Sequence, residues 1–309
     1  MEKDSTDELI AKYLQYCQLQ KGLSEKTVKA YRIDLNQFSH YIGSDIHVCD
    51  KEQIQNYLSL LHKRYKPKSV RRKIASIKAF FGYLEDEQIM TPSPFIKLRI
   101  KLHTPFLLPK TIPLNTINLL LQCAYKRKNS LINDSPYRYA SCLRDIAVLE
   151  LLFATGIRVS ELCSIEVNAI DFANSTIKIY GKGSKERIIQ IGNADVLSAV
   201  RTYYENYSDI IHKNGYLFVN RLGNRLSDQS VRNMINTYVS YADIDQHITP
   251  HMFRHSFATL LLEEDVDIRY IQQLLGHSSI TTTQIYTHVT SKKQRDILTT
   301  KHPRNRISV

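Results

Sequence analysis

Residues 176–191, TIKIYGKGSKERIIQI, decide the fold class because they predict a β-hairpin in a chain that otherwise predicts helices. Ile177 and Ile179 alternate with other residues on the first arm, as in a strand with one buried face. Gly181 and Gly183 supply the turn, and isoleucines return on the second arm at alternate positions. These residues predict a small antiparallel sheet.

Helices flank this hairpin in the second half of the chain. We expect an apolar helix over Leu143–Phe153 with a break at Gly156, and another that Thr249 caps and a proline begins. Gly276 is expected to close a third helix, and Leu217–Asn220 to add one short strand. The predicted fold class is mainly α with a small antiparallel β-sheet.

The first hundred residues predict a bundle of short amphipathic helices. Ser24 can cap a helix that ends at Gly43, and Asp50 with Gln53 forms a capping box ahead of the next one. Ser69 is expected to cap a further helix with an apolar stripe and a basic flank.

The length of 309 residues favours two domains. Three prolines interrupt residues 103–114 and mark a linker. The predicted organisation is an N-terminal helical domain over 1–104, a linker over 105–113 and a second domain over 114–309. Residues 126–141 are polar, and we expect them to form a surface loop.

Composition favours a nucleic-acid partner. The formal net charge is +12 and the sequence pI is about 9.3, which suits a polyanion. No stretch is long and apolar enough to cross a membrane, and the N-terminus lacks the pattern of a secretory signal. Five scattered cysteines without a CxxC pair suit reduced thiols in the cytoplasm and indicate no metal site.

The positive charge is concentrated in residues 62–78, HKRYKPKSVRRKIASIK, which contain no acidic residue. Solvated surfaces usually mix both signs of charge. We therefore expect its cations to contact DNA: Lys63, Arg64, Lys66, Lys68, Arg71, Arg72, Lys73 and Lys78.

Four short motifs of the second half together offer the groups that phosphodiester cleavage without a metal requires. Such cleavage needs bidentate cations for the phosphate oxygens, a nucleophile, and an acid for the leaving group. The motifs are ATGIRVSEL (154–162), GKGSKER (181–187), TPHMFRHSFAT (249–259) and LLGHSSITTTQIYTHV (274–289). Their candidate residues are Arg158, Lys182, His251, Arg254, His277 and Tyr286, with Glu161 placed to hold Arg158.

Each motif alone is weak, but the ordered set closely resembles the tyrosine recombinase, or phage integrase, family, and is most like its Xer-type members. The His302–Arg304 tripeptide is also like the Xer ending, and the N-terminal half resembles the SAM-like core-binding domain of that family. The resemblance spans nearly the whole chain.

The resemblance implies a role for each candidate. Arg158 and Arg254 would clamp the scissile phosphate with help from His277, and His251 would assist removal of the nucleophile's proton. Lys182 would protonate the 5′-oxygen leaving group, although Lys178 and Lys185 lie close enough in sequence to compete.

By the same resemblance, Tyr286 would form a 3′-phosphotyrosine. Because that bond retains the energy of the broken linkage, rejoining needs neither a cofactor nor a metal.

Alternatives from other classes are a type IB topoisomerase-like enzyme and a non-catalytic DNA-binding protein on the same fold. The complete set of candidates disfavours the latter, and the helix-forming tail at 291–300 disfavours the former. Within the family, chromosome dimer resolution and integration or excision of a mobile element both remain open, with a slight preference for the Xer-like role.

The resemblance also implies a C-shaped clamp around double-stranded DNA and a homotetramer on two short core sites, in which a second recombinase can take part. Each tail would dock on the next protomer.

Overall fold

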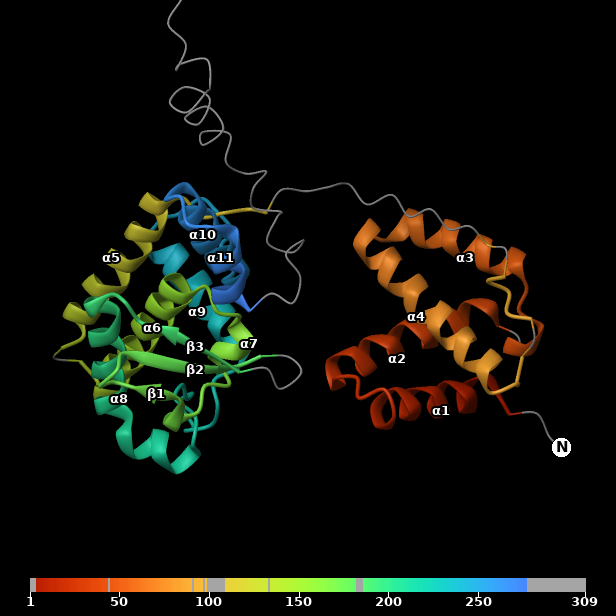
Figure 1. Cartoon of the computed structure of the whole chain (residues 1–309), viewed down its shortest axis with the longest axis horizontal. Coiled ribbons are helices and arrows are strands. Elements are labelled where there is room, and N and C mark those ends of the chain that lie inside the picture. Colours follow the sequence, from red (N-terminus) through yellow and green to blue (C-terminus); the bar gives the residue numbers. More distant parts are fainter. Residues whose placement is uncertain are drawn as a thin grey trace, which may run out of the picture. The chain divides into compact units, whose positions relative to one another are not determined.

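The computed structural model describes residues 4–43, 45–90, 92–96, 98, 109–132, 134–181 and 186–276. The chain divides into two compact units, Met1–Phe106 and Leu107–Val309 (Figure 1). Within the described ranges, no helix combines the length and the apolar character needed to span a membrane.

The first unit is helical throughout its described elements. In chain order they are α1 (Thr6–Leu19), α2 (Glu25–Ile42), the 3₁₀ turn η1 (Ile46–Val48), α3 (Lys51–Arg64) and α4 (Pro67–Asp86).

Local capping signals explain most of these boundaries. Ser24 accepts a hydrogen bond from Thr27 at the start of α2, and Gly43 ends that helix in the left-handed conformation. Asp50 begins α3 with the expected capping box. The prediction that Ser69 caps the next helix is wrong: α4 begins at Pro67, because proline's fixed φ suits the first position of a helix.

Helix α4 packs against α1, α2 and α3. Phe80 and Phe81 of α4 are fully buried, and their rings contact Tyr13 of α1 and Phe38 of α2 at centroid distances of 5.3 and 6.0 Å. Aromatic packing therefore holds α4 in the centre of this unit and leaves its basic flank exposed.

The second unit combines helices with one sheet. In chain order its elements are α5 (Leu114–Ser130), α6 (Pro136–Thr155), α7 (Val159–Leu162), the 3₁₀ turn η2 (Val167–Ala169), β1 (Ile170–Asp171), β2 (Thr176–Tyr180), β3 (Glu186–Gln190), α8 (Ala194–Asn214), α9 (Asp228–Tyr241), α10 (Pro250–Glu263) and α11 (Ile268–Leu275).

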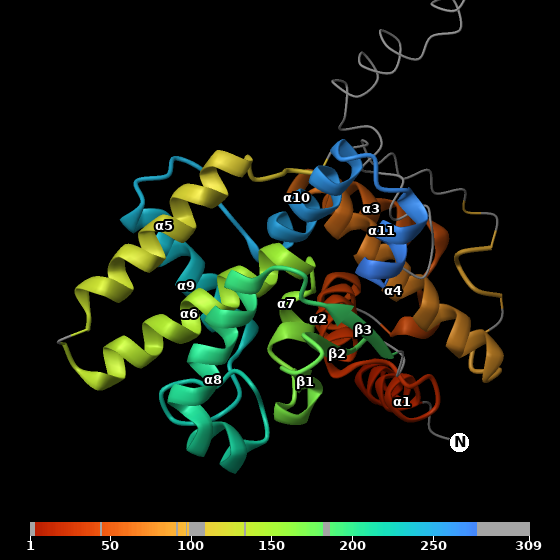
Figure 2. The ribbon, with the colours of Figure 1, turned by 60° about the vertical axis from the view of Figure 1, so that its left-hand side comes forward.

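The apolar helix α6 forms the core of this unit and packs against α5, α8 and α10 (Figure 2). It starts earlier than expected, and the surface loop predicted over 126–141 is wrong. Helix α5 continues to Ser130 and α6 begins at Pro136, so only residues 131–135 connect them. The polar side chains of this stretch lie mostly on exposed helix surface, which composition alone does not distinguish from a loop.

The predicted hairpin is confirmed, with β2 and β3 antiparallel and Ile177 opposite Ile189. Both isoleucines are buried. A two-residue strand, β1, extends the sheet in the order β1-β2-β3. Residues 217–220 are not a strand of this sheet, because Val219 forms only an isolated bridge to Arg225.

The end of the predicted linker is attached to the second unit. The backbone N–H of Ile112 donates to Ser256 Oγ at 2.6 Å, and the Ser256 hydroxyl donates to the Ile112 carbonyl at 3.1 Å. Gln246 also donates to the carbonyl of Thr111. Helix α10, which carries the TPHMFRHSFAT motif, is thus fixed to the point where the chain enters this unit.

Candidate active site

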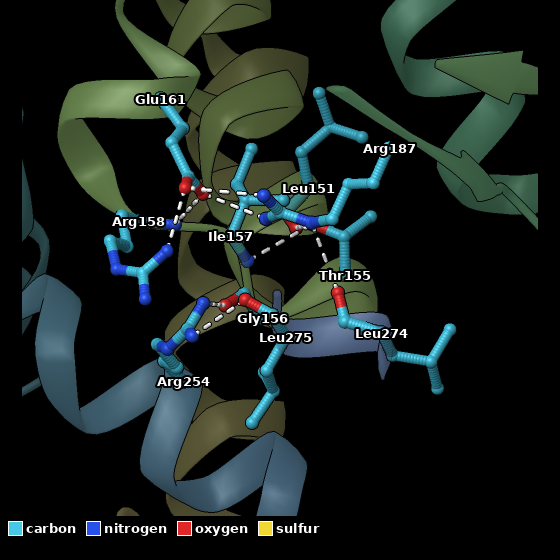
Figure 3. A network of polar contacts seen from close by, with 10 residues as sticks. All are labelled: Leu151, Thr155, Gly156, Ile157, Arg158, Glu161, Arg187, Arg254, Leu274 and Leu275. Carbon is cyan, nitrogen blue, oxygen red and sulfur yellow. Dashed lines mark hydrogen bonds and ion pairs between the residues drawn. The ribbon is translucent and has the colours of Figure 1, made fainter. Parts of the chain in front are cut away.

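Arg158 lies at the junction of two helices. Gly156 ends α6 with a φ of 59°, and Arg158 is the N-cap of α7. Its backbone N–H donates to Glu161 Oε2 at 3.0 Å, and its Nη1 donates to Oε1 at 2.7 Å (Figure 3). The carboxylate therefore fixes both the backbone and the guanidinium of Arg158, whose side chain is 36% exposed.

Glu161 also binds a second guanidinium, that of Arg187 on β3. Arg187 Nη2 donates to Oε2 at 2.8 Å and Nη1 to Oε1 at 3.2 Å. Burial raises the pKa of the Glu161 carboxyl, but the hydrogen bonds from Arg187 and Arg158 more than offset it and hold the pKa below its usual value. The Glu161 carboxylate is thus ionised and binds two arginine side chains at once.

Arg254 of α10 is only 2% exposed and binds two backbone carbonyls. Its Nη1 donates to Gly156 at 2.8 Å and its Nη2 to Leu275 at 2.7 Å (Figure 3). The two carbonyls therefore fix both terminal nitrogens of this guanidinium.

The C-terminal end of α11 is held by two guanidinium groups. Arg187 Nε donates to the carbonyl of Leu274 at 3.2 Å, next to the Leu275 carbonyl that Arg254 binds. Cations commonly satisfy the last carbonyls of a helix. The network therefore joins the motifs of Arg158 and Arg254 to the start of the LLGHSS motif.

His251 lies on the first turn of α10 and is exposed. Its ring centroid is 5.4 Å from that of His255. Burial, together with the charges of His251 and Arg254, lowers the pKa of His255 to about 4. His255 is therefore neutral near pH 7.

Of the predicted catalytic residues, the structure brings Arg158 and Arg254 together around Gly156, with Glu161 between Arg158 and Arg187. Lys182, His277 and Tyr286 lie outside the described residues, as does Lys185.

Lys178, the other alternative to Lys182, pairs with Glu186 at 2.7 Å across the hairpin. Its ammonium group is thus held by a carboxylate on the neighbouring strand.

Arg187 was missed by the sequence reasoning, although a signal for it exists. It precedes Ile189 by two positions on β3, so it shares the inward side of the hairpin with that buried residue. A charged side chain on a buried face requires a charged or hydrogen-bonding partner. The alternation in ERIIQI thus predicts a buried acidic partner for Arg187.

The predicted DNA-contacting cations behave differently from one another. Lys73 is 3% exposed, and its Nζ donates to the buried Asp34 at 2.9 Å. The prediction that Lys73 contacts DNA is therefore wrong, because its ammonium group is buried inside the bundle and paired with a carboxylate. Arg72 also pairs with Asp34 but keeps a side chain that is 44% exposed. The others are exposed: Lys63, Arg64, Lys66, Lys68, Arg71 and Lys78.

Comparison with known proteins identifies the class. The phage integrase family profile matches residues 126–293, and the profile of its N-terminal SAM-like domain matches residues 10–88. The chain therefore belongs to the phage integrase, or tyrosine recombinase, family, whose members break and rejoin DNA strands. This confirms the resemblance seen in the four motifs.

Individual relatives cover nearly the whole chain. A tyrosine recombinase of Agathobacter rectalis is 53% identical over 296 residues, which are 96% of each chain. Tyrosine recombinase XerD of Staphylococcus saprophyticus is 37% identical, over 96% of this chain and 99% of that protein. Among solved structures, XerH bound to its difH substrate before cleavage shares the fold with a TM-score of 0.74 at 20% identity, over 97% of both chains.

Proposed function

We propose that the chain recombines DNA at specific sites through attack of Tyr286 on the scissile phosphate. The Tyr286 oxygen bonds to phosphorus, the bond to the 5′-oxygen breaks, and a 3′-phosphotyrosine remains. The observation that carries this proposal is the convergence of Arg158 and Arg254 on Gly156. Glu161 holds the guanidinium of Arg158, and the carbonyl of Gly156, two residues before Arg158, holds that of Arg254.

In this scheme each cation has a separate task. Arg158 and Arg254 bind the non-bridging oxygens, where two permanently charged donors stabilise the charge that develops in the transition state. His277 donates a further hydrogen bond and His251 helps to accept the proton of Tyr286. Lys182 protonates the leaving 5′-oxygen.

The first unit supplies affinity for the duplex. The exposed cations of residues 62–78, at the end of α3 and on α4, are well suited to phosphate contacts because this stretch contains no acidic residue. Arg71 and Lys78 lie seven residues apart on α4 and therefore share one flank of that helix.

The stoichiometry follows from the chemistry. Exchange between two duplexes breaks four strands, and each break consumes one tyrosine, so we propose a homotetramer on two DNA sites. A second recombinase can replace two of the four protomers. The tail at 291–300, which would dock on the next protomer, lies outside the described residues.

The similarity to a XerD protein favours chromosome dimer resolution in the cytoplasm over integration or excision of a mobile element. Mapping covalently attached protein on genomic DNA tests this choice. Adducts that gather at one chromosomal locus would support it, whereas adducts at the ends of a mobile element would contradict it.

Tyr286→Phe tests the chemistry. On a core site that carries a nick beside the cleavage position, the wild-type chain should accumulate a covalent adduct visible on a denaturing gel. The variant should form none yet bind DNA with nearly unchanged affinity, because affinity comes mainly from phosphate contacts. Tyr270→Phe is the matched control, because Tyr270 is 66% exposed on α11. An adduct formed by Tyr286→Phe would show that another residue is the nucleophile.

A further inference from the structure

Arg187 occupies the junction of three motifs. Its side chain is 14% exposed and reaches from β3 to both oxygens of Glu161 and to the carbonyl of Leu274. It pairs with Ile179 in the sheet register, one pair inward from the Tyr180–Glu186 pair that closes the hairpin. One guanidinium thus connects the hairpin, the Arg158 segment and the end of α11.

The position of Arg187 is tightly defined. A Cβ placed on Gly276 would lie 3.1 to 3.3 Å from its Nη1, Cδ and Cζ atoms. Gly276 is the left-handed C-cap of α11, and the guanidinium lies directly against it. Arg187 therefore packs against the C-terminal end of α11. All three nitrogens of its guanidinium donate hydrogen bonds to oxygen atoms.

The charge of Glu161 has a consequence for Arg158. Glu161 orients Arg158 at 2.7 Å, but a carboxylate at that distance also cancels much of the positive potential that a phosphate would feel. Arg158, Arg187 and Arg254 bring three positive charges and Glu161 brings one negative charge, so the group retains two net positive charges. Without Arg187 only one would remain.

We propose that Arg187 is a positioning residue of the cleavage reaction: it neutralises Glu161, so that Glu161 can orient Arg158 while the charge of Arg158 stays available to the scissile phosphate. The proposal rests on the recombinase function described above. It assigns to Arg187 no contact with DNA, and its effect passes through Glu161 and the end of α11.

Single-turnover cleavage of the nicked core site, at saturating protein, tests this role. Arg187→Gln should cleave about 10- to 100-fold more slowly, the range typical of partners that orient a functional ligand. Its dissociation constant for the same DNA should stay within about threefold of wild type, since phosphate contacts elsewhere supply affinity. Arg187→Lys, which keeps the charge but not the planar fork, should give an intermediate rate.

The double variant Glu161→Gln/Arg187→Gln separates charge from packing. It restores two net positive charges while removing both ion-pair partners, so it should cleave faster than Arg187→Gln and within about tenfold of wild type. It also carries the test if Arg187→Gln is too unstable, because it leaves no buried carboxylate that has lost one of its two cationic partners. Arg201→Gln is the control for loss of one positive charge, since Arg201 is an exposed residue of α8 that donates to the carbonyl of Phe172.

Three results would overturn the proposal: an unchanged cleavage rate in Arg187→Gln, a double variant that is no faster than Arg187→Gln, or an Arg187→Lys variant as slow as Arg187→Gln. If Arg187→Gln does not fold, a double variant slowed more than about tenfold would overturn it as well. Failure of the wild-type chain to form any adduct is a different outcome, since it contradicts the recombinase function itself.

Discussion

Gly156→Ala is expected to destabilise the second unit more than any ordinary helix-cap substitution. Gly156 ends α6 in the left-handed conformation, with a φ of 59°. A Cβ at this position would lie 2.5 Å from Phe257 Cδ1 and 3.0 Å from Leu275 Cδ2. These side chains come from α10 and α11, so the substitution forces apart the elements that carry Arg254 and the carbonyls it binds.

Two terms set the magnitude. Placing alanine in the left-handed region costs about 1–2 kcal/mol. Inserting a methyl group into a packed core adds about 1–3 kcal/mol. The expected loss in the free energy of unfolding is therefore about 2–5 kcal/mol.

Gly215→Ala is the matched control, because Gly215 ends α8 with a φ of 79° and has no atom within 4 Å of an added Cβ. Its cost should be the conformational term alone, about 1–2 kcal/mol. The chain has no tryptophan, so far-UV circular dichroism and amide hydrogen exchange suit the measurement better than intrinsic fluorescence. Exchange resolved on α6 and α10 reports the second unit separately.

Equal destabilisation by Gly156→Ala and Gly215→Ala would refute the reasoning, since it would mean that crowding by Phe257 contributes nothing. A second readout is cleavage of the nicked core site at a temperature where both variants are folded. Because the Gly156 carbonyl accepts from Arg254 at 2.8 Å, only Gly156→Ala should slow cleavage.

Three further predictions address charge. Arg254→Lys should slow single-turnover cleavage by about 10²–10³, because an ammonium cannot hold two carbonyls and a phosphate in one plane; a rate near wild type would place Arg254 outside the site. Since burial lowers the pKa of His255 to about 4 from an unfolded value of 6.5, the unfolded chain binds more protons between these values. Stability should therefore fall as pH drops from 6.5 toward 4, and the thermal midpoint of His255→Gln should fall less over that range; equal pH dependence would contradict this. Neutralising Arg71 and Lys78 together should reduce the log–log salt slope of DNA binding by up to about 1.8, whereas Lys73→Gln should lower stability and leave that slope unchanged.

Local signals predicted the helix boundaries well where one chemical feature dominates. Ser24, Asp50 and Gly43 satisfy backbone groups at helix ends, and these hydrogen bonds depend on residues at most four positions away. The same holds for the hairpin, whose alternation alone fixes which side is buried. The start of α4 was misplaced because two signals competed, and the proline at 67 prevailed over Ser69.

The sequence alone could not predict which charged residues form ion pairs between distant parts of the chain. Lys73 lies in an unbroken run of cations, yet its partner Asp34 comes from a helix 39 positions earlier. Arg187 meets Glu161 from 26 positions away. Residue type and spacing singled out Arg158 and Arg254 as candidates for phosphate binding, but which cations form ion pairs inside the fold depends on tertiary contacts.

The contacts of Arg158, Arg187 and Arg254 explain how three positively charged side chains lie close together within one site. Arg254 binds the carbonyl of Gly156 at the end of α6, and Arg187 and Arg254 bind the last carbonyls of α11. Helix C-termini carry partial negative charge, so both helices offset the repulsion that the guanidinium groups would otherwise feel. Glu161 supplies the remaining compensation. Because these partners are backbone carbonyls and one fixed carboxylate, the cations are already held in place, so the proposed binding of a phosphate would not require the fold to gather them.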